Sequence, residues 1–189
     1  ELRLKIAHLN GSPIAPSDVL PMMENMGLRV VRDIPYGVEL TVGDGSAEAV
    51  APHAWIHDFT MMTSDSNDVD LAASKEKFEA AFARIWTRDV EDDGFNRLVF
   101  RAGLTWREIV VLRAYCKYLG QINIPFSEAY MQDALVGNPE LACLLVDLFH
   151  ARCDPSLGVA AARKMVRASV DIEGRLEDVA NLDEDRIIR

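Results

Sequence analysis

Residues 55–62, WIHDFTMM, and residues 70–86, DLAASKEKFEAAFARIW, decide the fold, because the hydrophobic period changes between them. In the first stretch alternate side chains share a face, as in a strand with one buried side: Trp55, His57, Phe59 and Met61. In the second stretch apolar side chains recur at helical spacing: Leu71, Phe78, Phe82 and Ile85. We therefore expect strands before Asp70 and helices after it.

The first part of the chain predicts a β-α-β-β unit. Residues 1–9 alternate as a strand, residues 18–26 follow as a short helix, and residues 28–40 and 50–62 alternate again. This is the order in which a ferredoxin-like β-α-β-β-α-β module begins. The sequence offers no candidate for the last strand, so we expect an incomplete unit or one completed by chain before Glu1.

Single residues set the expected ends and faces of these elements. Ser17 is the expected N-cap of the short helix, and Gly27 suits a left-handed cap at its end. In the strand after Gly27 we expect four side chains in phase: Leu28, Val30, Ile34 and Tyr36.

After Asp70 the sequence predicts a series of helices. Thr105 and Glu108 form a capping box, Ser127 is a further N-cap, and Asn138-Pro139 restarts the chain as a helix. The predicted helices, in chain order, are 71–88, Asp92–Ala102, 105–120, 127–137, 138–153 and about 157–180. For the last helix we expect four packing positions: Val159, Val166, Val170 and Leu176.

Composition excludes several classes of protein. The 189 residues are 49% hydrophobic and 26% charged, which is ordinary globular usage. The net charge is −10, so phosphate backbones are repelled and nucleic-acid binding is disfavoured. The odd number of cysteines, three, argues against a disulfide framework. No apolar run approaches the ~20 residues of a membrane span. We expect a cytoplasmic protein that contacts neither nucleic acid nor membrane.

Both ends of the sequence look cut. Glu1 leads at once into a strand pattern, and the chain stops at Arg189 without a helix stop signal or a trailing linker. We therefore interpret the sequence as a piece of a longer polypeptide, whose function lies partly outside it.

No motif for catalysis or nucleotide binding occurs in the sequence. His57 and Asp58 point to opposite faces of a strand, so they are not a natural dyad, and we expect the histidines to be packed or surface residues. His150 and Cys153 share a helix face, but a structural zinc site takes four ligands. We assign no catalytic residue, no cofactor-binding residue and no metal ligand.

One loop is a candidate binding site. Asn10, Gly11 and Ser12 form the turn between the first strand and the first helix, where a glycine lets a ligand approach the backbone. Modules of this topology commonly bind effectors at that loop. The alternative is an ordinary turn.

Several separated blocks resemble the very large bacterial NAD-dependent glutamate dehydrogenases. The first two blocks resemble the last ACT-like regulatory module of that family, and the others its following helical motif and the joint ahead of the catalytic domain. The blocks are VLPMMENMGLRV (19–30), WIHDF (55–59), DDGFNRLV (92–99), WRE (106–108), LRAY (112–115), LLVDLF (144–149), ARCDP (151–155) and LDEDRIIR (182–189).

The resemblance implies an α+β chain with an ACT-like β-α-β-β unit over residues 1–66 and a helical motif over residues 70–189. It implies that the full-length parent oxidatively deaminates L-glutamate to 2-oxoglutarate with NAD and is a homo-oligomer. The catalytic lysines and the nucleotide-binding fold follow later in such proteins, so this piece needs no cofactor of its own. Its partner is then the rest of the same polypeptide.

Three functional hypotheses remain open at this stage. The chain is a regulatory and structural segment of the dehydrogenase, without catalysis of its own. Alternatively, it is an amino-acid effector-binding module that uses Asn10, Gly11 and Ser12. A third hypothesis is a free-standing helical interaction protein.

Overall fold

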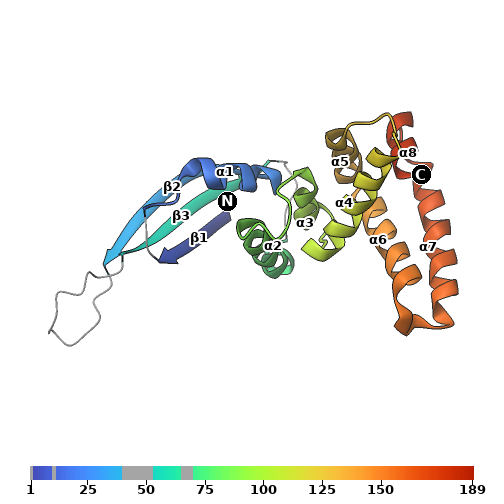
Figure 1. Cartoon of the computed structure of the whole chain (residues 1–189), viewed down its shortest axis with the longest axis horizontal. Helices are drawn as coiled ribbons and strands as arrows, with labels where there is room; N and C mark the ends of the chain where they lie inside the picture. The colour runs from blue at the N-terminus through green and yellow to red at the C-terminus, as the bar shows by residue number, and fades with distance from the viewer. Residues whose placement is uncertain (1, 10–11, 40–52, 65–69) are drawn as a thin grey trace. The chain divides into compact units, whose positions relative to one another are not determined.

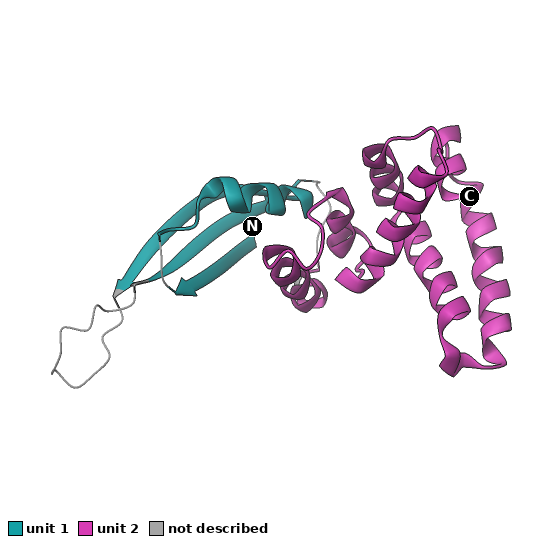
Figure 2. Ribbon diagram, viewed as in Figure 1, with its two compact units in different colours: residues 1–68 teal, residues 69–189 magenta. Residues whose placement is uncertain are grey.

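The computed structural model describes residues 2–9, 12–39, 53–64 and 70–189. The chain forms two compact units, Glu1–Asp68 and Val69–Arg189 (Figure 2). All described strands belong to the first unit, and every described helix except one belongs to the second. The change of period near Asp70 therefore marks a real change from sheet to helices.

The first unit has the predicted β-α-β-β order (Figure 1). Its elements are β1 (Leu2–Leu9), α1 (Pro16–Asn25), β2 (Leu28–Glu39) and β3 (His53–Thr63). The strands form one antiparallel sheet in the order β1-β3-β2, with β3 in the middle. An antiparallel sheet buried on one side explains the alternation along β1, where half-buried and exposed residues take turns.

The core of the first unit is formed where α1 meets the sheet. Val19 and Met23 of α1 are fully buried, as is Met26 just after it. Phe59 and Met61 of β3 are at most 2% exposed. Each such side chain contributes about 1.5–3 kcal/mol when it leaves water, so these five contacts supply much of the unit's stability.

A β-bulge in β2 overturns one expected face. The register pairs Val30 with Met61 but Arg32 with Thr60, so one extra residue lies between them. After the bulge Asp33 is opposite Phe59 and joins the face that Val30 occupied, because an inserted residue reverses the alternation. The expectation that Ile34 and Tyr36 continue the face of Leu28 and Val30 is wrong for this reason.

The start of α1 also differs from the prediction, whereas its end agrees. The N-cap is Ala15, without a side-chain hydrogen bond, and Pro16 occupies the first helical position. Proline has the right φ for that position and lacks the N–H that would need a partner, so Ser17 is not the cap. Gly27 has φ 78°, the left-handed conformation expected after the helix.

All the regular secondary structure in the described part of the second unit is helical. Its α-helices are α2 (Leu71–Trp86), α3 (Leu98–Arg101), α4 (Trp106–Gln121), α5 (Glu128–Gly137), α6 (Pro139–Cys153), α7 (Ala160–Leu176) and α8 (Leu182–Ile188), with 3-10 turns η1 (Gly94–Arg97) and η2 (Pro155–Leu157). Asp70 is itself the N-cap of α2, accepting hydrogen bonds from the Ala72 and Ala73 N–H groups. The preference for helix over a fourth strand after Asp92 is confirmed.

The predicted caps of α4 and α5 are present. The Thr105 side chain accepts from the Glu108 N–H, and the Glu108 carboxylate accepts from the Thr105 N–H at 2.7 Å. Ser127 accepts from the Tyr130 N–H. A capping box fixes where a helix begins because the side chain of each member accepts a hydrogen bond from the backbone N–H of the other.

The last predicted helix is wrong in length and in its packing face. The chain turns at Gly158 (φ 49°), α7 ends at Leu176, and Asn181 caps the separate helix α8. The buried side of α7 consists of residues four apart: Ala168, Ile172 and Leu176. Val159, Val166 and Val170 are instead exposed. Val166 and Leu176 are ten residues apart, which places them about 80° apart around a helix.

Within the described parts of the chain, no single helix is long and apolar enough to cross a membrane. Among the helices that the structure describes, only α5 and α6 taken together reach the required length and composition, and they are bent by 100° at the break between them.

We predict that Thr105→Ala lowers the free energy of unfolding by about 1 kcal/mol, because the capping box loses its hydroxyl acceptor. Ser17→Ala is the matched control and leaves stability within about 0.5 kcal/mol, since the Ser17 hydroxyl is exposed and its hydrogen bond among the described residues is to the neighbouring Asp18. Urea unfolding followed by circular dichroism measures both. Equal losses in the two variants would contradict the assignment of Ala15 as the cap of α1.

Candidate functional site

The candidate effector loop joins β1 to α1. Asn10 and Gly11 lie outside the described residues, and Ser12 is exposed at a bend. Two residues further on, the Ile14 N–H donates a hydrogen bond to Nε2 of His57 at 3.0 Å. The end of the loop that leads into α1 is therefore fastened to β3, the central strand of the sheet.

His57 is the polar centre of the first unit. It is 1% exposed, and its Nδ1 lies 3.1 Å from both carboxylate oxygens of Asp33. Because Nε2 accepts from Ile14, the proton of a neutral ring lies on Nδ1 and is donated to Asp33. A second proton on Nε2 would face the Ile14 N–H and break that bond. The acceptor nitrogen of the ring is therefore already in use.

Two further rings pack on His57. The ring of His8 lies 6.2 Å away and that of Phe59 5.7 Å away, both stacked. The Nε2 atom of His8 is buried and has no hydrogen-bond partner within the part of the chain that the structure describes. The cluster holds the end of the loop at Ile14 and fills one face of the sheet.

The alternation along residues 55–62 predicted that His57 and Phe59 share a face, and their stacked rings confirm it. The same alternation predicted that His57 and Asp58 do not form a dyad, and this is confirmed: the Asp58 carboxylate accepts from Arg3 at 2.9 Å on the other face of the sheet. It missed Asp33, because only the bulge in β2 brings Asp33 to the face of His57. A bulge leaves no signal in the order Arg32-Asp33-Ile34 that would have revealed it.

The second unit contains a buried arginine. Arg113 of α4 is 4% exposed and binds Asp93 through two nitrogens, at 2.6 Å and 2.9 Å. A third contact joins it to the Asn96 side-chain oxygen at 3.0 Å, and its guanidinium lies over the Phe95 ring. Bidentate binding to a carboxylate is the strongest arrangement available to a guanidinium.

The 3-10 turn η1, which follows Asp93, is also joined to α5. The Gly94 N–H donates to the Gln132 side-chain oxygen at 3.2 Å, and Arg97 binds Asp133 at 2.6 Å. A Cβ on Gly94 would lie 2.7 Å from that Gln132 oxygen. The motif DDGFNR therefore has a structural task, which is to hold η1 between α4 and α5.

Burial disfavours the reactive thiolate form of two of the three cysteines. Burial, followed by the charges of Glu128 and Asp93, raises the pKa of the Cys116 thiol to about 12. Burial also raises the pKa of Cys143, with Asp147 adding to the effect. Among the described residues no group of three or more histidine, cysteine and acidic side chains is placed to hold a metal ion.

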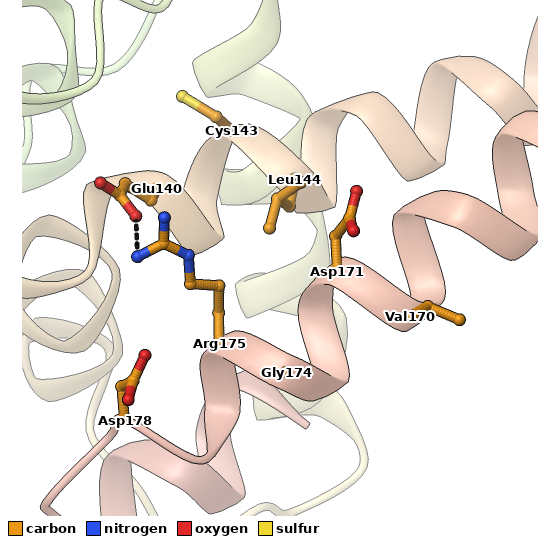
Figure 3. A pocket seen from close by; sticks show the side chains of 8 residues that line it. All are labelled: Glu140, Cys143, Leu144, Val170, Asp171, Gly174, Arg175 and Asp178. Carbon is orange, nitrogen blue, oxygen red and sulfur yellow. Dashed lines mark ion pairs between the residues drawn. The ribbon is translucent and has the colours of Figure 1, made fainter.

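A cavity of about 630 Å³ lies between α6 and α7 (Figure 3). Glu140 of α6 and Arg175 of α7 point toward one another across it and form an ion pair at 2.5 Å. Asp171, Asp178 and Val170 also line the cavity. The ion pair of Arg175 with Glu140 therefore links α7 to α6.

A second cavity, of about 340 Å³, is mainly apolar and lies between α4, α6 and α8. Leu112, Leu145 and Phe149 line it, together with Arg152 and Arg189. Arg189 is engaged by Asp185 at 3.0 Å.

Two family models match the chain. Residues 1–74 match the ACT3 domain of glutamate dehydrogenase, and residues 90–155 match its helical motif 3. The whole chain aligns with the NAD-specific glutamate dehydrogenases of Halomonas elongata, at 40% identity, and of Pseudomonas aeruginosa, at 38%. The enzyme of that name from Mycobacterium tuberculosis is 36% identical over 96% of the chain.

The chain belongs to the NAD-specific glutamate dehydrogenase family. It spans about 11% of the length of these relatives. The resemblance inferred from the separated sequence blocks is thereby confirmed, both for the ACT-like unit and for the helical motif. The helical motif 3 match includes all of the Arg113 network, whereas α7 and α8 lie beyond it.

We predict that Arg113→Ala lowers the free energy of unfolding by about 3–5 kcal/mol, because Asp93 loses its buried partner. Arg84→Ala is the control, with a loss below about 1 kcal/mol, since Arg84 and Asp89 form a pair that is about half exposed at each partner. Denaturant unfolding measures both variants. Similar losses of unfolding free energy in the two variants would show that the Arg113 network is not a main source of stability in the helical unit.

We predict that His57→Phe increases amide exchange at Ile14 at least about tenfold and destabilises the first unit by about 2 kcal/mol, because the Ile14 N–H and Asp33 both lose a partner. His8→Phe is the control and leaves stability unchanged or higher, since it removes a buried nitrogen that lacks a described partner. Hydrogen exchange by NMR measures the effect; unchanged exchange at Ile14 would refute the role given to His57.

We predict that a disulfide reagent at pH 8 modifies Cys153 in the folded chain but not Cys116. Cys153 is exposed, whereas a thiol with a pKa of about 12 is ionised at that pH in only about one molecule in ten thousand. Counting modified thiols by mass spectrometry before and after unfolding tests this. Modification of Cys116 in the folded chain would contradict the packing of α4.

Proposed function

We propose that the chain is a non-catalytic regulatory and structural segment of an NAD-dependent glutamate dehydrogenase. Its full-length parent then oxidatively deaminates L-glutamate to 2-oxoglutarate, binds NAD elsewhere in the polypeptide, and works in the cytoplasm as a homo-oligomer. The observation that carries the proposal is the nature of the matched segments, an ACT domain and a helical motif, within relatives about nine times longer.

The geometry of the described residues supports a scaffold. The acceptor nitrogen of His57 is occupied by Ile14, and both carboxylate oxygens of Asp93 bind Arg113. A general base or a substrate-binding carboxylate needs a free lone pair directed at the substrate. In the proposed division of labour, residues 1–66 act as the ACT-like domain and residues 70–189 as a spacer, with the rest of the polypeptide as partner.

The test compares the purified chain with the intact enzyme that carries it. We expect no heat of NAD binding in calorimetry and no glutamate-dependent formation of NADH by the chain alone, with both signals present in the intact enzyme. Turnover by the purified chain would overturn the proposal.

A second candidate is an effector-binding module at Asn10, Gly11 and Ser12. One observation favours it: the loop passes directly to Ile14, whose N–H is held by His57, so a ligand that displaces the loop would change the hydrogen bonding of the sheet. Regulation requires such a difference in contacts between two states.

Calorimetric titration of the chain with the twenty amino acids decides this candidate. Binding by one of them that is lost in Ser12→Ala and His57→Phe but kept in His8→Phe would support it. No binding by any of the twenty would remove it.

A further inference from the structure

The cavity between α4, α6 and α8 is lined mainly by apolar side chains, many of them buried. Five of its lining residues are at most 7% exposed: Leu112, Cys116, Leu135, Ile187 and Ile188. Protein interiors are packed so closely that voids larger than one water molecule are few. A cavity of about 340 Å³ is far larger than such a void, and it lies within the size range of small-molecule sites, about 300–1,000 Å³.

The cavity also reaches the surface of the helical unit. Tyr115 of α4 and Arg152 of α6 line it, and both residues are exposed. The ring of Tyr115 meets the ring of Phe149 edge to face, with 6.3 Å between the ring centres. A small molecule can therefore enter beside this aromatic pair without unfolding the helices.

The charges at the cavity are all positive. Among the described residues that line it the charged ones are Arg152 and Arg189, although the whole chain has 30 acidic and 20 basic residues. Arg189 is engaged by Asp185 at 3.0 Å. Arg152 has no hydrogen bond or ion pair with any residue that the structure describes. A guanidinium beside an apolar cavity favours an anion, and a carboxylate matches its two parallel N–H donors.

The same lining selects among anionic ligands. An amino acid would bring an ammonium group, which is costly to desolvate without a partner, and no acidic side chain is among the described lining residues. A nucleotide or other polyanion would need several free cations, whereas Arg152 alone is uncommitted there among the described residues. The chemistry that remains is one carboxylate attached to an apolar body.

The volume of the cavity sets the length of that body. One water molecule takes up roughly 30 Å³ in the liquid. At that volume for each non-hydrogen atom, a cavity of about 340 Å³ has room for about eleven such atoms. A saturated carboxylic acid of about eight carbons fits this limit.

We propose that the cavity between α4, α6 and α8 binds a monocarboxylate with an apolar body of about eight carbons. The carboxylate accepts hydrogen bonds from Arg152, and the apolar body lies against Leu145, Leu148 and Phe149. The inference goes beyond the proposed function and does not rest on it, because neither NAD binding nor turnover enters the argument.

The experiment titrates octanoate into the intact protein, including any chain that flanks residues 1–189, and measures the heat of binding. We expect one site per chain, with a dissociation constant on the order of 100 µM. Octylamine and octan-1-ol carry the same apolar chain without the carboxylate, and we expect both to bind at least about tenfold more weakly. Leucine, which adds an ammonium group, gives no heat of binding at this cavity.

Two variants test the residues that hold the ligand. Arg152→Gln weakens octanoate at least about tenfold and leaves the affinity for octan-1-ol unchanged, because only the carboxylate contact is lost. Arg163→Gln is the matched control: Arg163 is an exposed arginine of α7 that does not line the cavity, and its loss leaves octanoate binding unchanged. Leu145→Trp fills the cavity and abolishes binding, with circular dichroism as the check that the variant is folded.

Hydrogen exchange followed by mass spectrometry locates the ligand. We expect octanoate to slow amide exchange in α4, α6 and α8, and to leave β1 and β3 unchanged. Protection confined to other elements, equal affinity for octylamine, or full octanoate affinity in Arg152→Gln would each overturn the inference. So would the absence of binding to the intact protein, because the cavity would then be filled by other parts of the polypeptide. None of these results changes the NAD-binding and turnover assays.

Discussion

The bidentate contact between Arg113 and Asp93 organises the helical unit. Arg113 is only 4% exposed, so its guanidinium has lost most of its hydration and its charge must be matched by a buried partner. Asp93 meets this need with both carboxylate oxygens, while one of them also accepts from the Phe95 N–H and starts η1. One side chain thus sets the turn and the position of α4. The turn then places Phe95 and Leu98 at the centre of the core, both fully buried.

Periodicity and local hydrogen bonding made much of the fold predictable from sequence. The β-α-β-β order and the capping box of Thr105 and Glu108 depend on residues within a few positions of one another, and both are present. The length of α7 was not predictable in this way. Its end after Leu176 precedes a short segment and a new cap at Asn181, and no proline marks the break.

Features that depend on distant residues were missed for a physical reason. Asp33 reaches His57 only because an extra residue in β2 reverses the alternation, and the sequence shows no sign of that residue. The buried side of α7 was misassigned because the valines are more hydrophobic than Ala168, although Ala168 shares a face with Ile172 and Leu176. The burial of Arg113 likewise follows from tertiary packing, because an arginine in an amphipathic helix normally lies in water.

The bulge in β2 has a further consequence for how the sheet meets other strands. Within the described residues β1 and β2 each pair with β3 alone, so they are the two margins of the sheet. The β2 margin is interrupted by the bulge and by Pro35, which has no amide proton to donate. The β1 margin has neither interruption, so its amides and carbonyls keep a regular spacing. A strand added at the β1 margin would meet regularly spaced amides and carbonyls, whereas the bulge and Pro35 hinder edge-to-edge pairing at the β2 margin.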